Sequence, residues 1–155
     1  MSGNPPAAVE RFVRKHRVAR LATVDERGRP HVVPVSYAYA RGRLYTPLDL
    51  KPKAVAPEGL RRVRNILANP QVQVLIDDYD EDWSRLAFVQ LRGTAALLHE
   101  GPEYRQASRL LTRKYPQYGV MPLAGRPIIE MTIEGVVAWG RLSPRTAGRS
   151  PSPGR

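Results

Sequence analysis

The 155-residue chain contains no cysteine. This absence excludes disulfide frameworks, thiolate metal sites and cysteine nucleophiles. The sequence also has no apolar run near the ~20 residues that a membrane-spanning helix needs, and no signal-peptide core. A cysteine-free chain without these features suits a reducing compartment, so we expect a cytoplasmic protein.

Standard catalytic and nucleotide-binding signatures are missing as well. There is no GxSxG, HExxH, Walker A or GxGxxG pattern. The three histidines, His16, His31 and His99, are scattered without ligand spacing, so we interpret them as surface or strand-end residues. The acidic run "DDYDED", residues 77–82, lacks the spacing of an EF-hand and is interpreted as a solvated loop. We therefore predict no metal site and assign no catalytic residue.

Acidic residues are scarce relative to basic ones. The net charge is +11, which makes nucleic acid, an anionic membrane surface or a small anionic ligand the candidate partners. Four of the arginines lie in residues 141–155, which contain no acid and are rich in proline, serine and glycine. Such a segment cannot bury enough apolar surface to fold. We predict one folded domain over residues 1–142 and a disordered tail over residues 143–155.

Hydrophobic periodicity predicts three helices and six strands. The helices are expected at residues 5–16, 59–70 and 101–115. The strands are expected at residues 17–24, 31–40, 44–47, 71–78, 85–98 and 126–140. Hairpins occur early and late without regular βαβ alternation, which favours a mainly β fold: a six-stranded antiparallel barrel with flanking helices.

The segment "GLRRVRNILANP", residues 59–70, places two arginines in the first turn of its helix. A helix N-terminus has unpaired N–H groups and partial positive charge, so it favours an acid or a bound anion there. The apolar stripe is expected from Leu60, Val63, Ile66 and Leu67, with Arg64 at its margin. Arg61, Arg62 and Asn65 then lie opposite, in an arrangement that suits a phosphate. The alternative is a solvated basic face with Glu58 as its counter-charge.

The segment "HVVPVSYAYA", residues 31–40, has one face of small side chains. Val33, Val35, Tyr37 and Tyr39 share one face, and Val32, Pro34, Ser36 and Ala38 share the other. A proline within a strand indicates an edge or bulge position. The small face leaves room for a flat group against the backbone; the alternative is that it packs under a helix.

The segment "LYTP" ends a strand shortly before two lysines. Tyr45 and Thr46 supply hydroxyl groups, and Lys51 and Lys53 supply amines, that would converge on the same anion as the arginine helix. The alternative is a loop with solvated lysines. Trp83 and Trp139 are expected to be core or interface aromatics rather than stacking platforms.

These segments, taken in order, resemble the pyridoxamine-phosphate-oxidase-like superfamily of flavin-binding split barrels over about residues 8–140. The resemblance rests on "RLATVDERGRPHVVPVSY", "RLYTPLD", "RRVRNILANPQVQVLI" and "LRGTAAL". It implies a split β-barrel in which the second strand lies behind the isoalloxazine ring and the basic helix grips the cofactor phosphate. Transferred to this sequence, it implies Val33, Pro34, Val35 and Ser36 at the ring, and Thr46, Arg61, Arg62 and Asn65 at the phosphate.

Within the superfamily the chain is most similar to small bacterial enzymes that use the deazaflavin coenzyme F420. Pyridoxamine phosphate oxidases typically have a longer C-terminal segment that helps to bind their substrate. Many deazaflavin relatives have a lysine where this chain has Arg62, which keeps the charge and changes the geometry. The polyglutamate tail of F420 would be attracted by Lys51 and Lys53 or by the N-terminal helix. F420 is the cofactor that the resemblance favours, and FMN is the alternative.

The resemblance also implies a homodimer with the cofactor at the interface. Hydride would pass between the cofactor and a small conjugated substrate, with protonation by solvent or by a tyrosine such as Tyr37 or Tyr79. One alternative is a protein that binds a flavin or deazaflavin without turnover. Another is a nucleic-acid-binding barrel, which would interleave exposed aromatic and basic side chains; here the tyrosines alternate with small residues. We therefore expect neither nucleic acid nor a membrane as partner.

Overall fold

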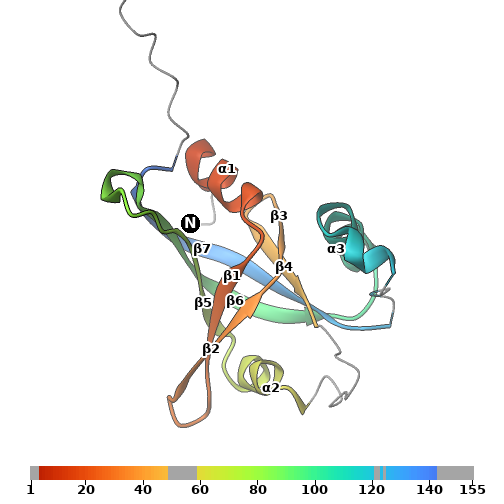
Figure 1. Ribbon diagram of the computed structural model, residues 1–155. Coiled ribbons are helices and arrows are strands. Elements are labelled where there is room, and N and C mark those ends of the chain that lie inside the picture. The colour runs from red at the N-terminus through yellow and green to blue at the C-terminus, as the bar shows by residue number, and fades with distance from the viewer. Residues whose placement is uncertain (1–3, 49–58, 121–122, 124, 143–155) are drawn as a thin grey trace, which may run out of the picture.

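A computed structural model describes residues 4–48, 59–120, 123 and 125–142 (Figure 1). The predicted tail, residues 143–155, and the predicted ligands Lys51 and Lys53 lie outside these described residues. The helices are α1 (Ala7–Lys15), α2 (Arg61–Ala68) and α3 (Pro102–Lys114), with short 3-10 helices η2 (Trp83–Arg85) and η3 (Pro116–Gly119). The strands are β1 (Ala19–Val24), β2 (Pro30–Val35), β3 (Ala38–Ala40), β4 (Arg43–Pro47), β5 (Gln71–Asp78), β6 (Ala87–Leu98) and β7 (Ile128–Gly140).

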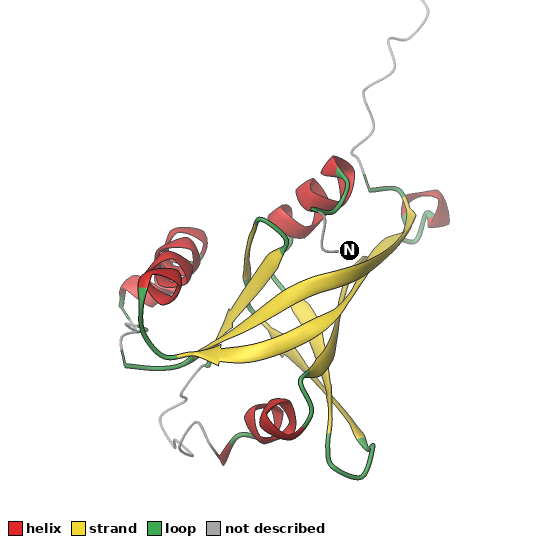
Figure 2. Cartoon of the chain, turned by 180° about the vertical axis from the view of Figure 1, so that it is seen from behind, coloured by secondary structure: helices red, strands yellow, loops and turns green. Residues whose placement is uncertain are grey.

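The seven strands form one sheet in the order β2-β1-β5-β6-β7-β4-β3, and every pair of neighbours is antiparallel. The sheet is strongly curved, and α1 and α2 lie at its opposite ends (Figures 1 and 2). The predicted fold class, a mainly β antiparallel split barrel with flanking helices, is confirmed. Among the described residues, no helix combines the length and apolarity needed to span a bilayer.

The predicted number of strands is wrong by one, because residues 31–40 form two strands rather than one. β2 pairs with β1, whereas β3 pairs with β4 at the other edge of the sheet. The chain changes partner at Ser36 and Tyr37. The N–H of Tyr37 donates to the Tyr115 hydroxyl at 3.0 Å, and its carbonyl lies 3.0 Å from the same hydroxyl. A side chain 78 residues away therefore satisfies the backbone where the strand is interrupted.

The core fills the inside of the curved sheet and the space beneath the three α-helices. Val9, Phe12 and Val13 of α1 are buried in the larger cluster, with the inward residues of β1, β5 and β6. Ala107 and Leu111 of α3 pack in a second cluster with Tyr45 and Tyr115. α1 and α3 each close part of the barrel, and α2, which buries Val63 and Ile66 in the larger cluster, lies beside the turn between β1 and β2.

Candidate functional site

The helix α2 begins at Arg61, two residues after the predicted start at residue 59, and its first turn contains no compensating group. Its N-cap residue, Leu60, provides no side-chain hydrogen bond, and the first turn contains no acid. The free N–H groups and the partial positive charge of this helix end therefore coincide with the side chains of Arg61 and Arg62. An anion is the group that would stabilise such an end.

The buried face of α2 differs from the predicted stripe. Val63 and Ile66 are buried as expected, but Leu67 is 66% exposed and Asn65 only 4% exposed. The Asn65 amide Nδ2 donates to the Thr23 hydroxyl of β1 at 3.0 Å. Because that bond satisfies a buried polar group, the helix turns Asn65 inward and Leu67 outward. The expectation that Leu67 is buried and Asn65 faces away from the core is wrong.

A polar hollow of about 310 Å³ lies between α2 and the turn that joins β1 to β2. We call it the arginine hollow. Its lining residues are Asp25, Glu26, Arg27, Arg29, Arg61, Arg64, Asn65 and Ala68. Arg64, expected at the margin of the apolar stripe, faces the hollow together with Arg61. Arg62 is half-buried and is not among the lining residues.

The turn opposite α2 is held by Asp25. Its Oδ1 accepts the backbone N–H groups of Arg27 and Arg29 at 2.8 and 2.9 Å, and its Oδ2 accepts Arg29 Nε at 2.7 Å. These bonds, the Arg29 backbone N–H first, lower the pKa of Asp25 to about 2. Arg29 thus has its counter-ion, whereas Arg27, Arg61 and Arg64 form no ion pair with any described residue. Four arginines and only two acids, Asp25 and Glu26, line the hollow, so its described lining has an excess of positive charge.

The two hydroxyl groups predicted on β4 lie in different environments, because successive strand residues face opposite sides. Thr46 is 1% exposed, and its Oγ1 has no hydrogen-bond partner among the described residues. Tyr45 donates its hydroxyl to Glu103 of α3 at 2.9 Å. Burial, and then the bond to Glu103, raise the pKa of Tyr45 to about 12. The structure therefore does not bring Tyr45 to the arginine hollow.

The strand β2 lies at an edge of the sheet, as Pro34 predicts. Val32 is 62% exposed and Pro34 is also exposed, so the face with small side chains is open over this strand. Val33 is half-buried and Val35 is buried. The Ser36 hydroxyl lies 2.6 Å from the hydroxyl of Tyr118. The four residues predicted to lie behind a flat ring thus present an open surface at Pro34 and a closed one at Val35.

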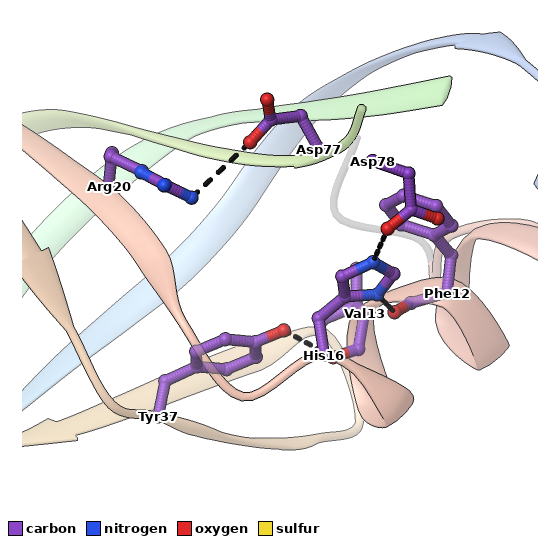
Figure 3. Close-up of polar contacts among 7 residues, drawn as sticks. All are labelled: Phe12, Val13, His16, Arg20, Tyr37, Asp77 and Asp78. Carbon is purple, nitrogen blue, oxygen red and sulfur yellow. Dashed lines mark hydrogen bonds and ion pairs between the residues drawn. The ribbon is translucent and has the colours of Figure 1, made fainter. Parts of the chain in front are cut away.

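Tyr37 is unsuited to the proton-transfer role considered for it. It is fully buried, and its hydroxyl donates to the carbonyl oxygen of Val13 at 2.5 Å (Figure 3). Burial raises its pKa above the usual tyrosine value. Tyr79, the other tyrosine considered, is exposed and lines a different hollow on β5, β6 and β7. Neither tyrosine faces the arginine hollow.

His16 is not the isolated histidine that its spacing suggests. Its Nδ1 lies 2.7 Å from the carbonyl oxygen of Phe12, and its Nε2 lies 2.6 Å from Asp78 Oδ1 (Figure 3). The neighbouring Arg20 bonds to Asp77 at 3.3 Å. The ring therefore fastens the C-terminal end of α1 to β5. Sequence spacing gives no signal for this contact, because its partners are 62 residues apart.

Comparison with known proteins agrees with this architecture. The family model described as pyridoxamine 5'-phosphate oxidase matches residues 5–140. No curated protein matches the chain significantly. Similar solved structures include a conserved hypothetical protein from Mycobacterium tuberculosis, with 20% identity, a TM-score of 0.72, and coverage of 88% of this chain and 85% of that one.

Two further structures share the fold and differ in the ligand that their names give. A FAD-binding protein from Mesorhizobium loti has 22% identity and a TM-score of 0.66, covering 87% of this chain and 92% of its own. HutZ, the heme storage protein from Vibrio cholerae, has 18% identity and a TM-score of 0.67, covering 85% and 92%. At these identities the likeness establishes the fold alone.

Proposed function

Because the chain belongs to the pyridoxamine 5'-phosphate oxidase family, we propose that it is an oxidoreductase that holds a flavin-type cofactor. F420 is the favoured cofactor and FMN the alternative. The observation that carries the proposal is the end of α2, which has two arginines, no acid and no side-chain cap in its first turn. A cofactor phosphate would provide the anion that this first turn lacks.

The residues present fit such a phosphate. Arg61 and Arg64 face the arginine hollow without ion pairs to described residues, and Arg62 stands beside Arg61 at the start of α2. The buried Thr46 hydroxyl has no hydrogen-bond partner among the described residues and does not line the arginine hollow, so its bond to a phosphate oxygen is part of the proposal. Asn65 would act indirectly, because its amide is bonded to Thr23 and sets the rotation of α2.

The remaining parts of the cofactor would follow the open edge strand. Residues 33–36 of β2 and the segment after it would lie behind the ring, with Pro34 offering an exposed surface. Lys51 and Lys53 would contact the anionic tail of F420. A flavin-type ring supplies hydride chemistry by itself, so the protein has only to bind, orient and shield it. This division of labour explains how such an enzyme functions without an acid–base triad.

The proposed reaction is hydride transfer between the cofactor and a small conjugated substrate in the cytoplasm. Tyr37 is excluded as the proton donor by its buried bond to Val13, so solvent is the proton source that we propose. A protein that binds the cofactor without turnover remains the second candidate, because the same fold occurs in a heme storage protein. Steady-state oxidation of reduced cofactor with an added electron acceptor would distinguish the two.

The phosphate-binding role is tested by the double variant Arg61→Ala plus Arg62→Ala. Two charge-assisted contacts are worth about 3 kcal/mol together, so cofactor affinity in a fluorescence titration should fall more than tenfold. The matched control is Arg105→Ala plus Arg109→Ala, which removes the same charge from exposed positions of α3. A loss below tenfold, or an equal loss in the control, would show that α2 does not hold the phosphate.

The identity of the cofactor is tested on the purified full-length chain by titration with F420, FMN and hemin in parallel. We expect the fluorescence or absorption change to saturate at the lowest ligand concentration with F420. Saturation by FMN at lower concentration would establish the alternative. A Soret band that saturates with hemin while neither flavin-type cofactor binds would overturn the proposal.

A further inference from the structure

A second cavity, of about 270 Å³, lies where α1, β3 and α3 meet. Its lining residues are Arg14, Ala38, Tyr39, Leu110, Arg113 and Lys114. We call it the Lys114 cavity. It shares no lining residue with the arginine hollow, and α1 lies at the opposite end of the barrel from α2 (Figures 1 and 2). Its role is therefore separate from the proposed phosphate site.

Three cations from two helices line this cavity, and none has an acidic partner among the described residues. Arg14 donates to the backbone carbonyl of Tyr39 at 3.3 Å and lies over the Tyr39 ring. Arg14, Arg113 and Lys114 form no ion pair within the described part of the chain. The carboxylate of Glu10, on α1, accepts a hydrogen bond from the Tyr39 hydroxyl at 2.6 Å. The cavity therefore concentrates positive charge that no described residue neutralises through an ion pair.

Lys114 lines the cavity, and its amine lies beside the cavity against two aromatic rings that are not part of the lining. Its Nζ is buried and has no hydrogen-bond partner among the described residues. It lies 3.9 Å from the centre of the Tyr37 ring and 5.5 Å from that of Tyr115, a ring that Arg17 also approaches. Burial, and then the charge of Arg17, lower the pKa of Lys114 to about 8. The aromatic faces attract the ammonium, but its three N–H donors have no acceptor among the described residues, which is costly for a buried group.

We propose that the Lys114 cavity binds a small organic carboxylate. The carboxylate group would lie among Arg14, Arg113 and Lys114 and would supply the acceptor that the buried amine lacks. The compact apolar body would rest on Ala38, Tyr39 and Leu110, which form the uncharged half of the lining. The cavity is slightly smaller than typical pockets for drug-sized ligands, which suits a molecule with a single ring.

Benzoate is the probe for this proposal, and benzyl alcohol is its neutral counterpart. Calorimetric titration of the full chain should show benzoate binding below about 10 mM and none by benzyl alcohol. Lys114→Met and, separately, Arg113→Met should each weaken benzoate binding at least about tenfold. Arg109→Met removes the same charge from an exposed position of α3 outside the cavity and should change affinity less than twofold. Arg113 is exposed, so its variant tests the site even where Lys114→Met fails to fold.

Chemical labelling provides a second readout. The rate at which acetic anhydride acylates Lys114, followed by mass spectrometry across pH, reports the titration of its amine. Saturating benzoate should shift the midpoint upward by about one unit or more, because a nearby anion favours the charged amine. The other ionisable groups that face the same region are Arg14, Arg17, Arg113, Tyr37, Tyr39 and Tyr115. The Arg109→Met chain therefore serves as the reference for general charge effects.

Any of three results overturns the proposal. The first is no benzoate binding below about 10 mM, and the second is that both Lys114→Met and Arg113→Met bind benzoate as tightly as the parent chain. The third is a labelling midpoint that benzoate does not change. Equal competition by inorganic phosphate would also overturn it, because the apolar half of the cavity would then contribute nothing. Benzoate binding in the Arg61→Ala plus Arg62→Ala chain should remain unchanged, so failure of this proposal and failure of the cofactor proposal are distinguishable.

Discussion

At the scale of single residues, the contact between Asn65 and Thr23 decides which face of α2 is buried. Asn65→Ala leaves the fully buried Thr23 hydroxyl without its donor, so the free energy of unfolding should fall by about 1–3 kcal/mol. Urea denaturation measures this change. Leu67→Ala is the matched control on the same helix and should cost under about 0.5 kcal/mol, because Leu67 is exposed. A larger loss for Leu67→Ala would restore the rotation expected from the helical wheel.

Lys114 gives a second prediction at this scale, in the pH dependence of stability. The pKa of Lys114 is lowered from 10.5 to about 8 in the folded state, chiefly by burial. Between these two values the unfolded state binds more protons, so the contribution of Lys114 to stability rises with pH from about 8 to about 10.5. The melting temperature of Lys114→Met minus that of the parent chain should therefore be higher at pH 7 than at pH 10. A difference in melting temperature that is equal at the two pH values, or lower at pH 7, would show that the Lys114 amine is not buried in this way.

At the scale of elements, strict alternation predicts a strand well when its neighbours are also strands. β5 occupies residues 71–78, as predicted, because every second residue of "QVQVLIDD" is needed inside the barrel up to Ile76. The same alternation continues through residues 31–40, although the chain changes partner at Tyr37. That break depends on the Tyr115 hydroxyl, which no local pattern reveals. Local periodicity thus predicts elements, while distant side chains set where they are interrupted.

In the candidate site too, local patterns are predictable from the sequence and contacts between distant residues are not. The anion-binding role proposed for the arginines of α2 is predictable from the sequence, because two arginines in the first turn of a helix conflict with the helix dipole. The sequence does not predict the inward rotation of Asn65, because Thr23 lies 42 residues away. It also gives no sign that the turn held by Asp25 belongs to the site. The "DERG" segment, residues 25–28, has the pattern of an ordinary turn until α2 is placed beside it.

The pairing of β6 with β7 yields a prediction about Gly93. A register shift lies between Arg92 and Gly93, and a Cβ at Gly93 would stand 1.9 Å from the Thr132 carbonyl oxygen. Because that neighbour is backbone, Gly93→Ala should cost about 1–3 kcal/mol or more in thermal or urea unfolding. Gly119→Ala is the control, since a Cβ there would meet open space, with nothing beyond its chain neighbours within 4 Å. Similar losses in both variants would show that the close approach is not maintained in solution.

At the scale of the whole molecule, an apolar face that is exposed among the described residues suits the homodimer that we expect. The outer faces of β5, β6 and β7 form a hollow of about 460 Å³, lined in part by Leu75, Tyr79, Phe88, Val137 and Trp139. Phe88 and Trp139 stack with ring centres 5.9 Å apart, and Trp139 is 53% exposed. Trp139 is thus not a core residue, and neither is the exposed Trp83. Large exposed apolar patches mark interaction sites, and a second copy of the chain is the partner that we expect.

This expectation leads to a prediction about Trp139→Glu. The parent chain should sediment as a homodimer, and the new carboxylate, beside Asp77 and Asp78 of the same hollow, should shift it toward monomer. Val120→Glu is the control, because Val120 is exposed and lies outside that hollow. Circular dichroism checks that both variants fold. If the cofactor lies at the interface, as the resemblance implies, Trp139→Glu should also weaken cofactor binding, although Trp139 does not line the arginine hollow. A dimeric Trp139→Glu chain would place the interface elsewhere, and a monomeric parent chain would refute the homodimer itself.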